Sequence, residues 1–280
     1  MRLGVDIGGT KIALAVLDAG GRELLRQRIP TPHGDYASAR QALADVILET
    51  ENRVQQRCTV GIGMPGLVAR DTGIVANAYN TPYNGQPLKP DLEKMLKREL
   101  RFANDARCFA LSEAVDGAAR DARVVFGAIL GTGVGGGIVV ERRVVEGRHQ
   151  IAGEWGHTPL PWMTADEHPG PECNCGRRGC IEQFVSGPAK NRDRDALGEA
   201  QAMALFTDRL ARAFSLVINF LDPDVIVVGG GMSKHDEIYA AVPPLLRKYV
   251  YHHDPRTPIV RAAHGDASGV RGAAMLWPPS

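Results

Sequence analysis

The chain opens with three apolar-rich runs, at residues 2–7, 12–17 and 23–29, separated by short breaks that contain glycine pairs. Runs of this length with such breaks are typical of antiparallel strands joined by tight turns. Apolar positions then recur at helical spacing, which predicts an amphipathic helix. The positions are Leu43, Val46, Ile47, Thr50 and Val54.

The pattern continues with alternating strands and helices. A strand is expected at 58–64, a helix at about 91–98 with Asp91 as its cap, a short strand at 100–103 and a third helix beginning at Asp105. The first part of the chain therefore reads as three strands followed by helix, strand, helix, strand and helix.

The same outline recurs later in the chain, which predicts a duplicated α/β fold of two domains. The expected elements are strands at 124–130 and 136–141, a helix at about 201–220, a strand at 225–228, a helix at 236–248, a strand at 258–261 and a helix from 268. We expect an N-terminal domain at 1–117, joined by the C-terminal helix 268–280, and a C-terminal domain at 118–267. The insertion 152–188 has little periodicity, so something other than a hydrophobic core is expected to hold it. The polar stretch 188–200 is expected to be a solvated connection.

Composition and charge narrow the class of protein. In 280 residues, 33 Lys and Arg balance 32 Asp and Glu, a formal net charge of +1, which argues against binding driven by a nucleic-acid backbone or an anionic membrane. Charged residues near the start leave no room for a secretory signal. The longest uncharged run, 124–140, has 17 residues and six glycines and is too short to span a membrane. We therefore expect a cytoplasmic protein.

Two glycine-rich segments occupy equivalent positions in the predicted folds of the two halves. Asp6-Ile7-Gly8-Gly9-Thr10-Lys11 places a carboxylate at the end of a strand, then glycines that let backbone N–H groups approach an anion. Gly131-Thr132-Gly133-Val134-Gly135-Gly136-Gly137 repeats the arrangement. Either segment alone is more often a simple hairpin turn, but the pair predicts two phosphate-binding loops that face one cleft.

Two further segments have both a structural and a functional interpretation. The run Gly229-Gly230-Gly231 follows a very apolar strand and is either a shelf for a base or ribose or a simple turn into a helix. Asn104-Asp105 stands where a strand gives way to a helix, so Asp105 is a candidate N-cap and a candidate general base.

One imidazole and three thiols have a spacing that suits a metal ion. His157, Cys173, Cys175 and Cys180 form a closed tetrahedral set typical of structural zinc, the alternative being three unrelated buried thiols. Glu154 and Glu182 flank these ligands. They are surface charges if no metal fixes the loops, and acceptors for sugar hydroxyls if one does.

These motifs, taken together, resemble the ROK family of bacterial sugar kinases over nearly the whole chain. The segments that carry the resemblance are Asp6–Lys11, Asn104-Asp105-Ala106, 131–137, Gly153-Glu154-Trp155-Gly156-His157, 173–182 and Asp222-Pro223-Asp224. Within the family, the amino-acid sequences of segments 84–87, 158–162 and 264–274 are most similar to those of the fructokinase (mannofructokinase) branch. The N-acetylglucosamine kinases and glucokinases of the family are the alternatives.

The resemblance implies an actin-like, ribonuclease H-like fold with a central cleft and a zinc-binding insertion. It implies ATP, Mg²⁺ and structural Zn²⁺ as cofactors, and transfer of the γ-phosphoryl group to a hexose hydroxyl on C6, with fructose the first expectation. It implies Asp105 as the base, and a sugar held by Asn104, Glu154, His157 and Glu182. Phosphates, magnesium and nucleotide fall to Asp6, Gly8, Gly9, Thr10, Lys11, Gly131, Thr132, Gly133, Gly135, Gly136, Gly229 and Gly230.

The sequence departs from the family pattern in two places. Arg107 stands where the family usually has Asn, and the segment 187–221 is shorter than in relatives, which puts a lid or a dimer contact in question. Family repressors carry a DNA-binding segment before the first loop, and only five residues precede Asp6, so we expect an enzyme. A sugar sensor without activity is the other alternative. The expected partner is a small sugar, with no nucleic acid and no membrane, and the protein is expected to be a monomer or homodimer.

Overall fold

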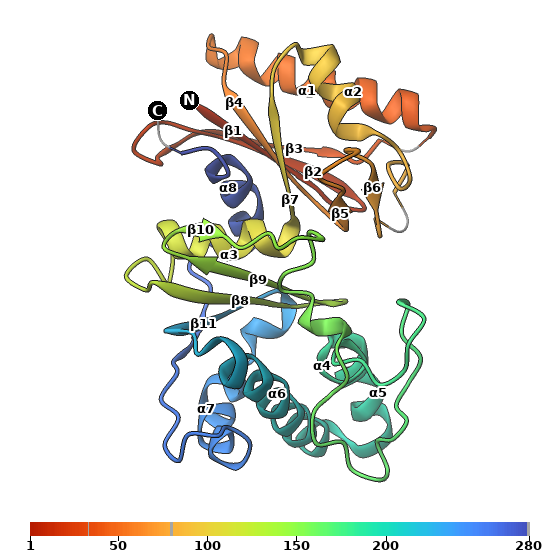
Figure 1. Cartoon of the computed structure of the whole chain (residues 1–280), viewed down its shortest axis with the longest axis vertical. Helices are drawn as coiled ribbons and strands as arrows, with labels where there is room; N and C mark the ends of the chain where they lie inside the picture. The colour runs from red at the N-terminus through yellow and green to blue at the C-terminus, as the bar shows by residue number, and fades with distance from the viewer. Residues whose placement is uncertain (33, 79–80, 279–280) are drawn as a thin grey trace. The chain divides into compact units, whose positions relative to one another are not determined.

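The computed structural model describes residues 1–32, 34–78 and 81–278. It divides into two compact units, Met1–Ser112 with Glu146–Ala152 and Ala267–Ser280, and Glu113–Val145 with Gly153–Asp266 (Figure 1). The segment Glu146–Ala152 belongs to the first unit although it interrupts the second in sequence, which the sequence pattern did not indicate. Each unit is described by itself.

The first unit is built on a five-stranded sheet whose opening meander is confirmed. β1 pairs antiparallel with β2, β2 pairs antiparallel with β3, and β1, β4 and β7 run parallel. The order across the sheet is β3 (Glu23–Pro30), β2 (Lys11–Leu17), β1 (Arg2–Ile7), β4 (Thr59–Met64) and β7 (Leu100–Asn104). A separate two-stranded sheet, β5 (Leu67–Val68) and β6 (Val75–Ala76), was not expected.

Helices cover both faces of this sheet (Figure 1). α1 (Tyr36–Val54) and α2 (Leu88–Leu96) pack on the face that carries Leu3 and Val5. α8 (Ser268–Met275) lies on the other face, where Gly4 and Gly61 stand. A Cβ at Gly4 would lie 2.0 Å from the carbonyl oxygen of Val270, so α8 approaches the sheet closely only because these positions lack a side chain.

Two predicted helix boundaries in this unit are wrong. α2 begins at Leu88 rather than at Asp91, and the Asp91 carboxylate accepts a hydrogen bond from the Tyr36 hydroxyl at 2.7 Å instead of capping the helix. α8 ends at Met275 rather than at 280, and residues 279–280 lie outside the described residues. α3 (Asp105–Val115) begins where the sequence predicts.

The second unit repeats the sheet order of the first, which confirms the predicted duplication. β8 pairs antiparallel with β9, and β8, β11 and β12 run parallel. Its order is β10 (Arg143–Val144), β9 (Val134–Val140), β8 (Val124–Leu130), β11 (Val225–Gly229) and β12 (Ile259–Arg261), which matches β3-β2-β1-β4-β7 position by position.

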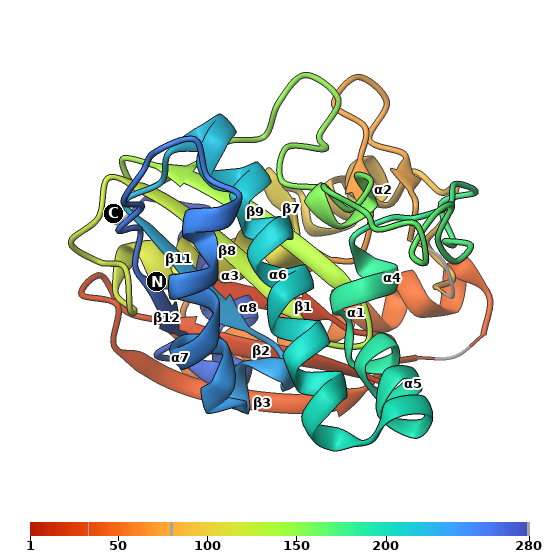
Figure 2. The same ribbon diagram turned by 90° about the horizontal axis from the view of Figure 1, so that it is seen from below.

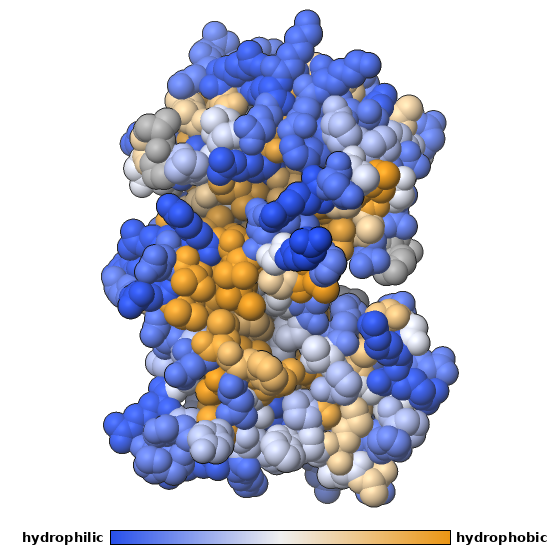
Figure 3. Space-filling model, viewed as in Figure 1, coloured by the Kyte–Doolittle hydropathy of each residue, from blue (hydrophilic) through white to orange (hydrophobic). Residues whose placement is uncertain are grey.

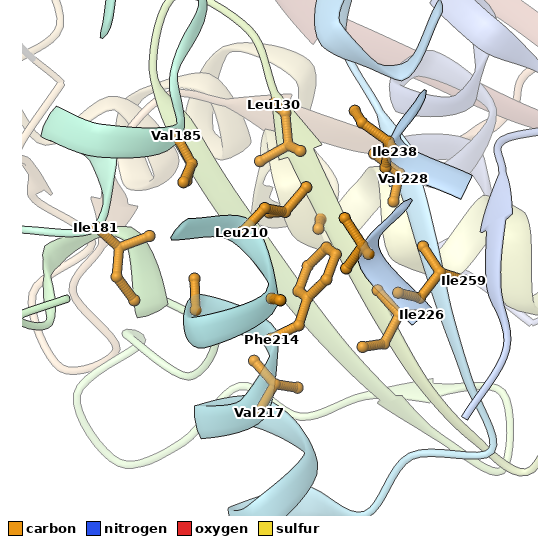
Figure 4. Close-up of a cluster of buried hydrophobic side chains, with 14 of the residues drawn as sticks. Leu130, Ile181, Val185, Leu210, Phe214, Val217, Ile226, Val228, Ile238 and Ile259 are labelled. Atoms are coloured by element: carbon orange, nitrogen blue, oxygen red, sulfur yellow. The ribbon is translucent and has the colours of Figure 1, made fainter. Parts of the chain in front are cut away.

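The core of this unit lies between its sheet and two helices, α6 (Glu199–Leu221) and α7 (Asp236–Leu245), which contact one another (Figure 2). Leu210 and Phe214 of α6 lie among Leu130, Ile226 and Val228 of the strands (Figure 4). Apart from α5 (Gly187–Leu197), the remaining elements are short: α4 (Glu182–Val185) and the 3-10 turns Trp155–His157, Gly231–Lys234, Leu246–Lys248 and Gly265–Ala267.

The expectation of a solvated connection at 188–200 is wrong. This stretch forms α5 (Gly187–Leu197), whose first turn is capped by the Ser186 hydroxyl accepting from the Ala189 N–H at 3.3 Å. α5 packs against α6 and buries only Ala189 and Lys190, which explains why its sequence looks like a loop.

The insertion 152–188 also contributes more to the core than its sequence indicates. Its buried apolar side chains are Trp155, Leu160, Ile181, Phe184 and Val185, all within the core of the second unit. The insertion is thus held by hydrophobic contacts as well as by its polar groups.

Hydrophilic and hydrophobic residues are distributed unevenly over the surface. On the face shown in Figure 3, hydrophilic residues cover α1 and α2, and hydrophobic residues gather over β8 and β9. No helix among the described residues is long and apolar enough to cross a membrane.

Candidate functional site

Asp6 supplies the carboxylate of the first predicted loop, and the pKa of this carboxylate is strongly raised. It stands near the end of β1, and ideal Cβ atoms at Gly63 and Gly269 would lie 3.7 and 2.8 Å from its oxygens, so two glycines make room for it. Burial, followed by the negative charge of Asp105, raises the pKa of Asp6 to about 7. A half-buried carboxylate beside a second acid is an arrangement that a hard divalent cation would relieve.

The turn after Asp6 is open to solvent. The Gly8 N–H donates to the carbonyl of Lys11 at 3.0 Å, and the Thr31 hydroxyl donates to the carbonyl of Gly8 at 2.6 Å. A Cβ at Gly9 would meet no atom within 4 Å, and Gly9, Thr10 and Lys11 are exposed. The turn is fixed at its base and accessible at its tip, as a loop that receives an anion must be.

Asn104 and Asp105 form the junction between β7 and α3. The Ala106 N–H donates to Asn104 Oδ1 at 2.9 Å and to Asp105 Oδ1 at 2.8 Å. The Asn104 amide also donates to the carbonyl of Gly66 at 3.1 Å. Both residues therefore take part in capping α3, and the cap orients Asp105 at the same end of the sheet as Asp6, whose pKa responds to its charge.

Arg107, the departure from the family pattern, is one of the largest fully buried side chains. Its guanidinium donates to the carbonyl of Ala152 at 3.2 Å and lies 3.5 Å from Gln150 Oε1. The long side chain therefore attaches the segment Glu146–Ala152 to α3. The sequence marked Arg107 as unusual but gave no sign of the partner.

In the second unit, two of the predicted nucleotide segments lie side by side. Gly131-Thr132-Gly133 forms the turn between β8 and β9, with the Gly131 N–H donating to the Gly133 carbonyl at 3.0 Å. A Cβ at Gly230 would lie 2.4 Å from the carbonyl oxygen of Leu130, immediately before that turn. Gly230 has φ +80°, so it needs glycine on both steric and conformational grounds.

The glycines at 135–137 belong to β9, so the loop is shorter than the predicted 131–137. The missing side chain of Gly136 makes room for the turn at 153–155, since a Cβ there would lie 2.6 Å from Trp155 Cδ1. The Trp155 indole N–H donates to the carbonyl of Gly135 at 3.0 Å, and its ring stacks on Phe214 at 5.4 Å. Trp155 thus anchors the segment that carries Glu154 and His157, a role that the sequence analysis missed.

The two flanking glutamates lie in different settings. Glu154 precedes the 3-10 turn Trp155–His157, and its carbonyl accepts from the His157 N–H at 3.2 Å. Glu182 begins α4, and its Oε2 accepts from the Val134 N–H at 2.9 Å. Its Oε1 lies 3.9 Å from Cys173 Sγ. Glu182 therefore joins the glycine turn to the cysteine cluster.

The four predicted metal ligands come together. The ligand atoms of His157, Cys173, Cys175 and Cys180 all lie within 4.8 Å of one another. Cys173 Sγ is 3.5 Å from His157 Nδ1, and Cys175 Sγ is 3.6 Å from Cys180 Sγ. Zn–S bonds of about 2.3 Å and Zn–N bonds of about 2.1 Å place tetrahedral ligand atoms about 3.5–3.8 Å apart. These distances fit a single ion.

The thiols of the cluster affect one another's pKa in opposite directions: burial and the hydrogen bonds with Cys175 and Cys173 raise the pKa of Cys180 to about 12, whereas that of Cys175 falls. Burial opposes ionisation of Cys175, but hydrogen bonds from the Arg177 backbone and from the two neighbouring thiols lower the pKa of Cys175 to about 7. Thiolate is the form that binds a metal. Gly176 and Gly179 have φ +82° and +72°, which lets the chain fold tightly around the cluster.

The site residues therefore form one acidic group in the first unit, and a glycine turn joined to the cluster of His157, Cys173, Cys175 and Cys180 in the second. Duplicated five-stranded sheets with these loops define the actin-like ATPase class of fold. The ROK family model matches residues 2–279, and the chain belongs to the ROK family.

Similar proteins agree with this assignment. The chain is 41% identical over 299 residues to an N-acetyl-D-glucosamine kinase of Yersinia pseudotuberculosis, covering 99% of this chain and 98% of the relative. A ROK hexokinase from Thermus thermophilus matches with a TM-score of 0.86 and 29% identity over 98% of this chain and 97% of that one. A ROK glucokinase from Streptomyces griseus in complex with glucose and AMPPNP matches with a TM-score of 0.80 and 26% identity, over 98% of each chain. These relatives do not support the fructokinase branch and agree with the alternative.

Proposed function

We propose that the protein is an ATP-dependent hexose kinase that phosphorylates N-acetyl-D-glucosamine on its C6 hydroxyl. The observation that carries the choice of sugar is the 41% identity, over almost the full length of both chains, to N-acetyl-D-glucosamine kinases. The sequences of segments 84–87, 158–162 and 264–274 favour fructose as the substrate, but these relatives do not support that preference.

The proposed chemistry depends on the acidic pair of the first unit. Asp105 takes the proton from the sugar hydroxyl as the hydroxyl oxygen bonds to the γ-phosphorus of ATP, and the bond from that phosphorus to the β,γ-bridging oxygen breaks to release ADP. The cap at the start of α3 holds Asp105 in a fixed orientation, which supports a role in proton transfer. Asn104, Glu154, His157 and Glu182 are proposed to bind the sugar hydroxyls.

The nucleotide is proposed to bind through backbone N–H groups and glycines. Gly8, Gly9, Thr10 and Lys11 in the exposed first turn, and Gly131, Thr132 and Gly133 in the second, hold phosphate oxygens. Gly229 and Gly230, beside the second turn, support the ribose or base. Gly135 and Gly136 shape the second turn from within β9 rather than contacting phosphate.

Two metal ions complete the proposal. Asp6 would hold Mg²⁺, which neutralises phosphate charge when bound, and the raised pKa of Asp6 supports a cation there. His157, Cys173, Cys175 and Cys180 would hold structural Zn²⁺, supported by the spacing of their ligand atoms.

A panel of sugars tests the substrate. Initial rates of ADP formation are measured with N-acetylglucosamine, glucose, mannose and fructose at saturating MgATP. We expect kcat/KM for N-acetylglucosamine to exceed that for fructose by at least about tenfold, because a site built to pair the acetamido group leaves polar atoms unpaired with other sugars. A higher kcat/KM for fructose would overturn the choice of sugar, and no ADP formation with any sugar would overturn the kinase.

A further inference from the structure

The second glycine turn is held at both ends by the segment that follows the cysteine cluster. The Val134 N–H donates to Glu182 Oε2 at 2.9 Å, and the Gly187 N–H donates to the carbonyl of Gly131 at 2.8 Å. A Cβ at Gly133 would lie 2.7 Å from Glu182 Oε2, so the carboxylate lies directly against the turn. These contacts fix the backbone of the turn from outside the sheet.

Glu182 is itself firmly placed. Its neighbours Ile181 and Val185 are fully buried in the core of the second unit and point into it (Figure 4). The Ile181 N–H donates to the carbonyl of Thr158 at 2.9 Å. Cys180, two residues before Glu182, belongs to the metal-binding cluster, and Glu182 Oε1 lies 3.9 Å from Cys173 Sγ.

We propose that Glu182 is a positioning residue for the nucleotide, which it serves through the Val134 N–H, in addition to its role at the sugar. The inference rests on the proposed function and deepens it. One oxygen of the carboxylate holds the phosphate-binding turn, and the other faces the thiol of Cys173 at 3.9 Å. The metal-binding insertion thereby sets the shape of the phosphate-binding turn.

The energetic reason is preorganisation. Without an acceptor at residue 182, the Val134 N–H loses its charged partner, and the turn between Gly131 and Val134 must be ordered when the nucleotide binds. The cost appears as weaker nucleotide binding. An uncharged acceptor of the same shape should retain most of the effect, because it still receives the N–H.

The test compares Glu182→Ala, Glu182→Gln and a control, Glu172→Ala, which removes an exposed glutamate of the same insertion paired with Arg178. Binding of AMPPNP with Mg²⁺ is measured by calorimetry without sugar, and binding of N-acetylglucosamine is measured without nucleotide. We expect Glu182→Ala to weaken AMPPNP binding about tenfold, and Glu182→Gln and Glu172→Ala to stay within about twofold of the unmodified protein. Both substitutions of Glu182 should weaken sugar binding.

Amide hydrogen exchange at Val134 gives a readout independent of affinity. Exchange should be faster in Glu182→Ala and unchanged in Glu182→Gln and Glu172→Ala. Unchanged exchange in Glu182→Ala, or equal loss of AMPPNP affinity in the Ala and Gln variants, would overturn the positioning role. Failure of the unmodified protein to bind N-acetylglucosamine, with the AMPPNP pattern intact, would overturn only the proposed substrate.

Discussion

Glu167 lies at the centre of a buried ion cluster that joins the insertion to α6. Its side chain is 6% exposed, and Arg209 and Arg212 are 9% and 3% exposed. Arg209 Nε donates to Oε1 at 2.8 Å, and the two terminal nitrogens of Arg212 donate to Oε2 and Oε1 at 2.6 and 2.9 Å. Burial opposes ionisation, but the hydrogen bonds from Arg212 and Arg209 outweigh it and lower the pKa of Glu167 to about 2.

The lowered pKa of Glu167 sets how much this carboxylate contributes to the free energy of unfolding, and over which pH range. A change from the ordinary value of 4.5 to about 2 corresponds to about 3 kcal/mol, since a tenfold change in an equilibrium is worth about 1.4 kcal/mol. Because the folded-state pKa is depressed, this stability is fully present above pH 4.5 and is lost as the pH falls from 4.5 toward 2. Glu167→Gln should therefore lower the free energy of unfolding by about 3 kcal/mol at pH 7, and by progressively less below pH 4.5.

The measurement is urea denaturation followed by tryptophan fluorescence between pH 3.5 and 7. A chelator in every sample prevents metal release from adding its own pH dependence. The matched control is Glu172→Gln, whose exposed pair with Arg178 should contribute under about 1 kcal/mol. The argument from the buried cluster is refuted if Glu167→Gln lowers the free energy of unfolding no more than the control does. It is also refuted if the decrease is the same at pH 3.5 as at pH 7.

Three further predictions concern the site and the fold. Asp105→Asn, which keeps an acceptor for the Ala106 N–H, should lower kcat about 10²- to 10⁴-fold with little change in sugar affinity, and near-normal turnover would remove Asp105 from the mechanism. Metal analysis should find one zinc per chain, and chelation should lower the melting temperature without unfolding the second unit; metal-free protein with the same melting temperature and activity would contradict the zinc site. Gly272→Ala should destabilise the protein by more than about 2 kcal/mol in urea denaturation, because its Cβ would lie 1.6 Å from the Cys108 carbonyl, whereas Gly131→Ala, with no atom within 4 Å, should not.

Most of the sheet framework was predictable because the longer strands carry their own signals, whereas the two-residue strands β5, β6 and β10 do not. Apolar runs broken by glycine or polar residues predict the three opening strands and also β4, β7 and β8. The recurrence of the pattern predicts the second sheet. α5 shows the limit. It buries only Ala189 and Lys190, so no apolar stripe marks it, and the start signal of Ser186 and Pro188 is its only local sign.

The cysteine cluster was predictable for a different reason. Thiols and an imidazole are rare enough that their spacing alone limits the chemistry, and the ligand atoms do lie together. What holds the insertion was not predictable, because Glu167 and its arginine partners are 42 and 45 residues apart in sequence. A charged residue in a polar segment looks like a solvated one until the fold brings its partners to it.

The glycines show most clearly where sequence reasoning ends. In the run 131–137, Gly131 stands in open space while a Cβ at Gly136 would collide with the turn at Gly153 and Trp155, so one glycine leaves the turn open to a ligand and the other serves packing. Nothing in the run distinguishes them, since the difference lies in residues about twenty positions away that touch only one of the two. The same holds for Gly133, whose neighbour is the carboxylate of Glu182. A glycine-rich motif therefore locates a loop, and only the three-dimensional contacts decide which of its members face a ligand.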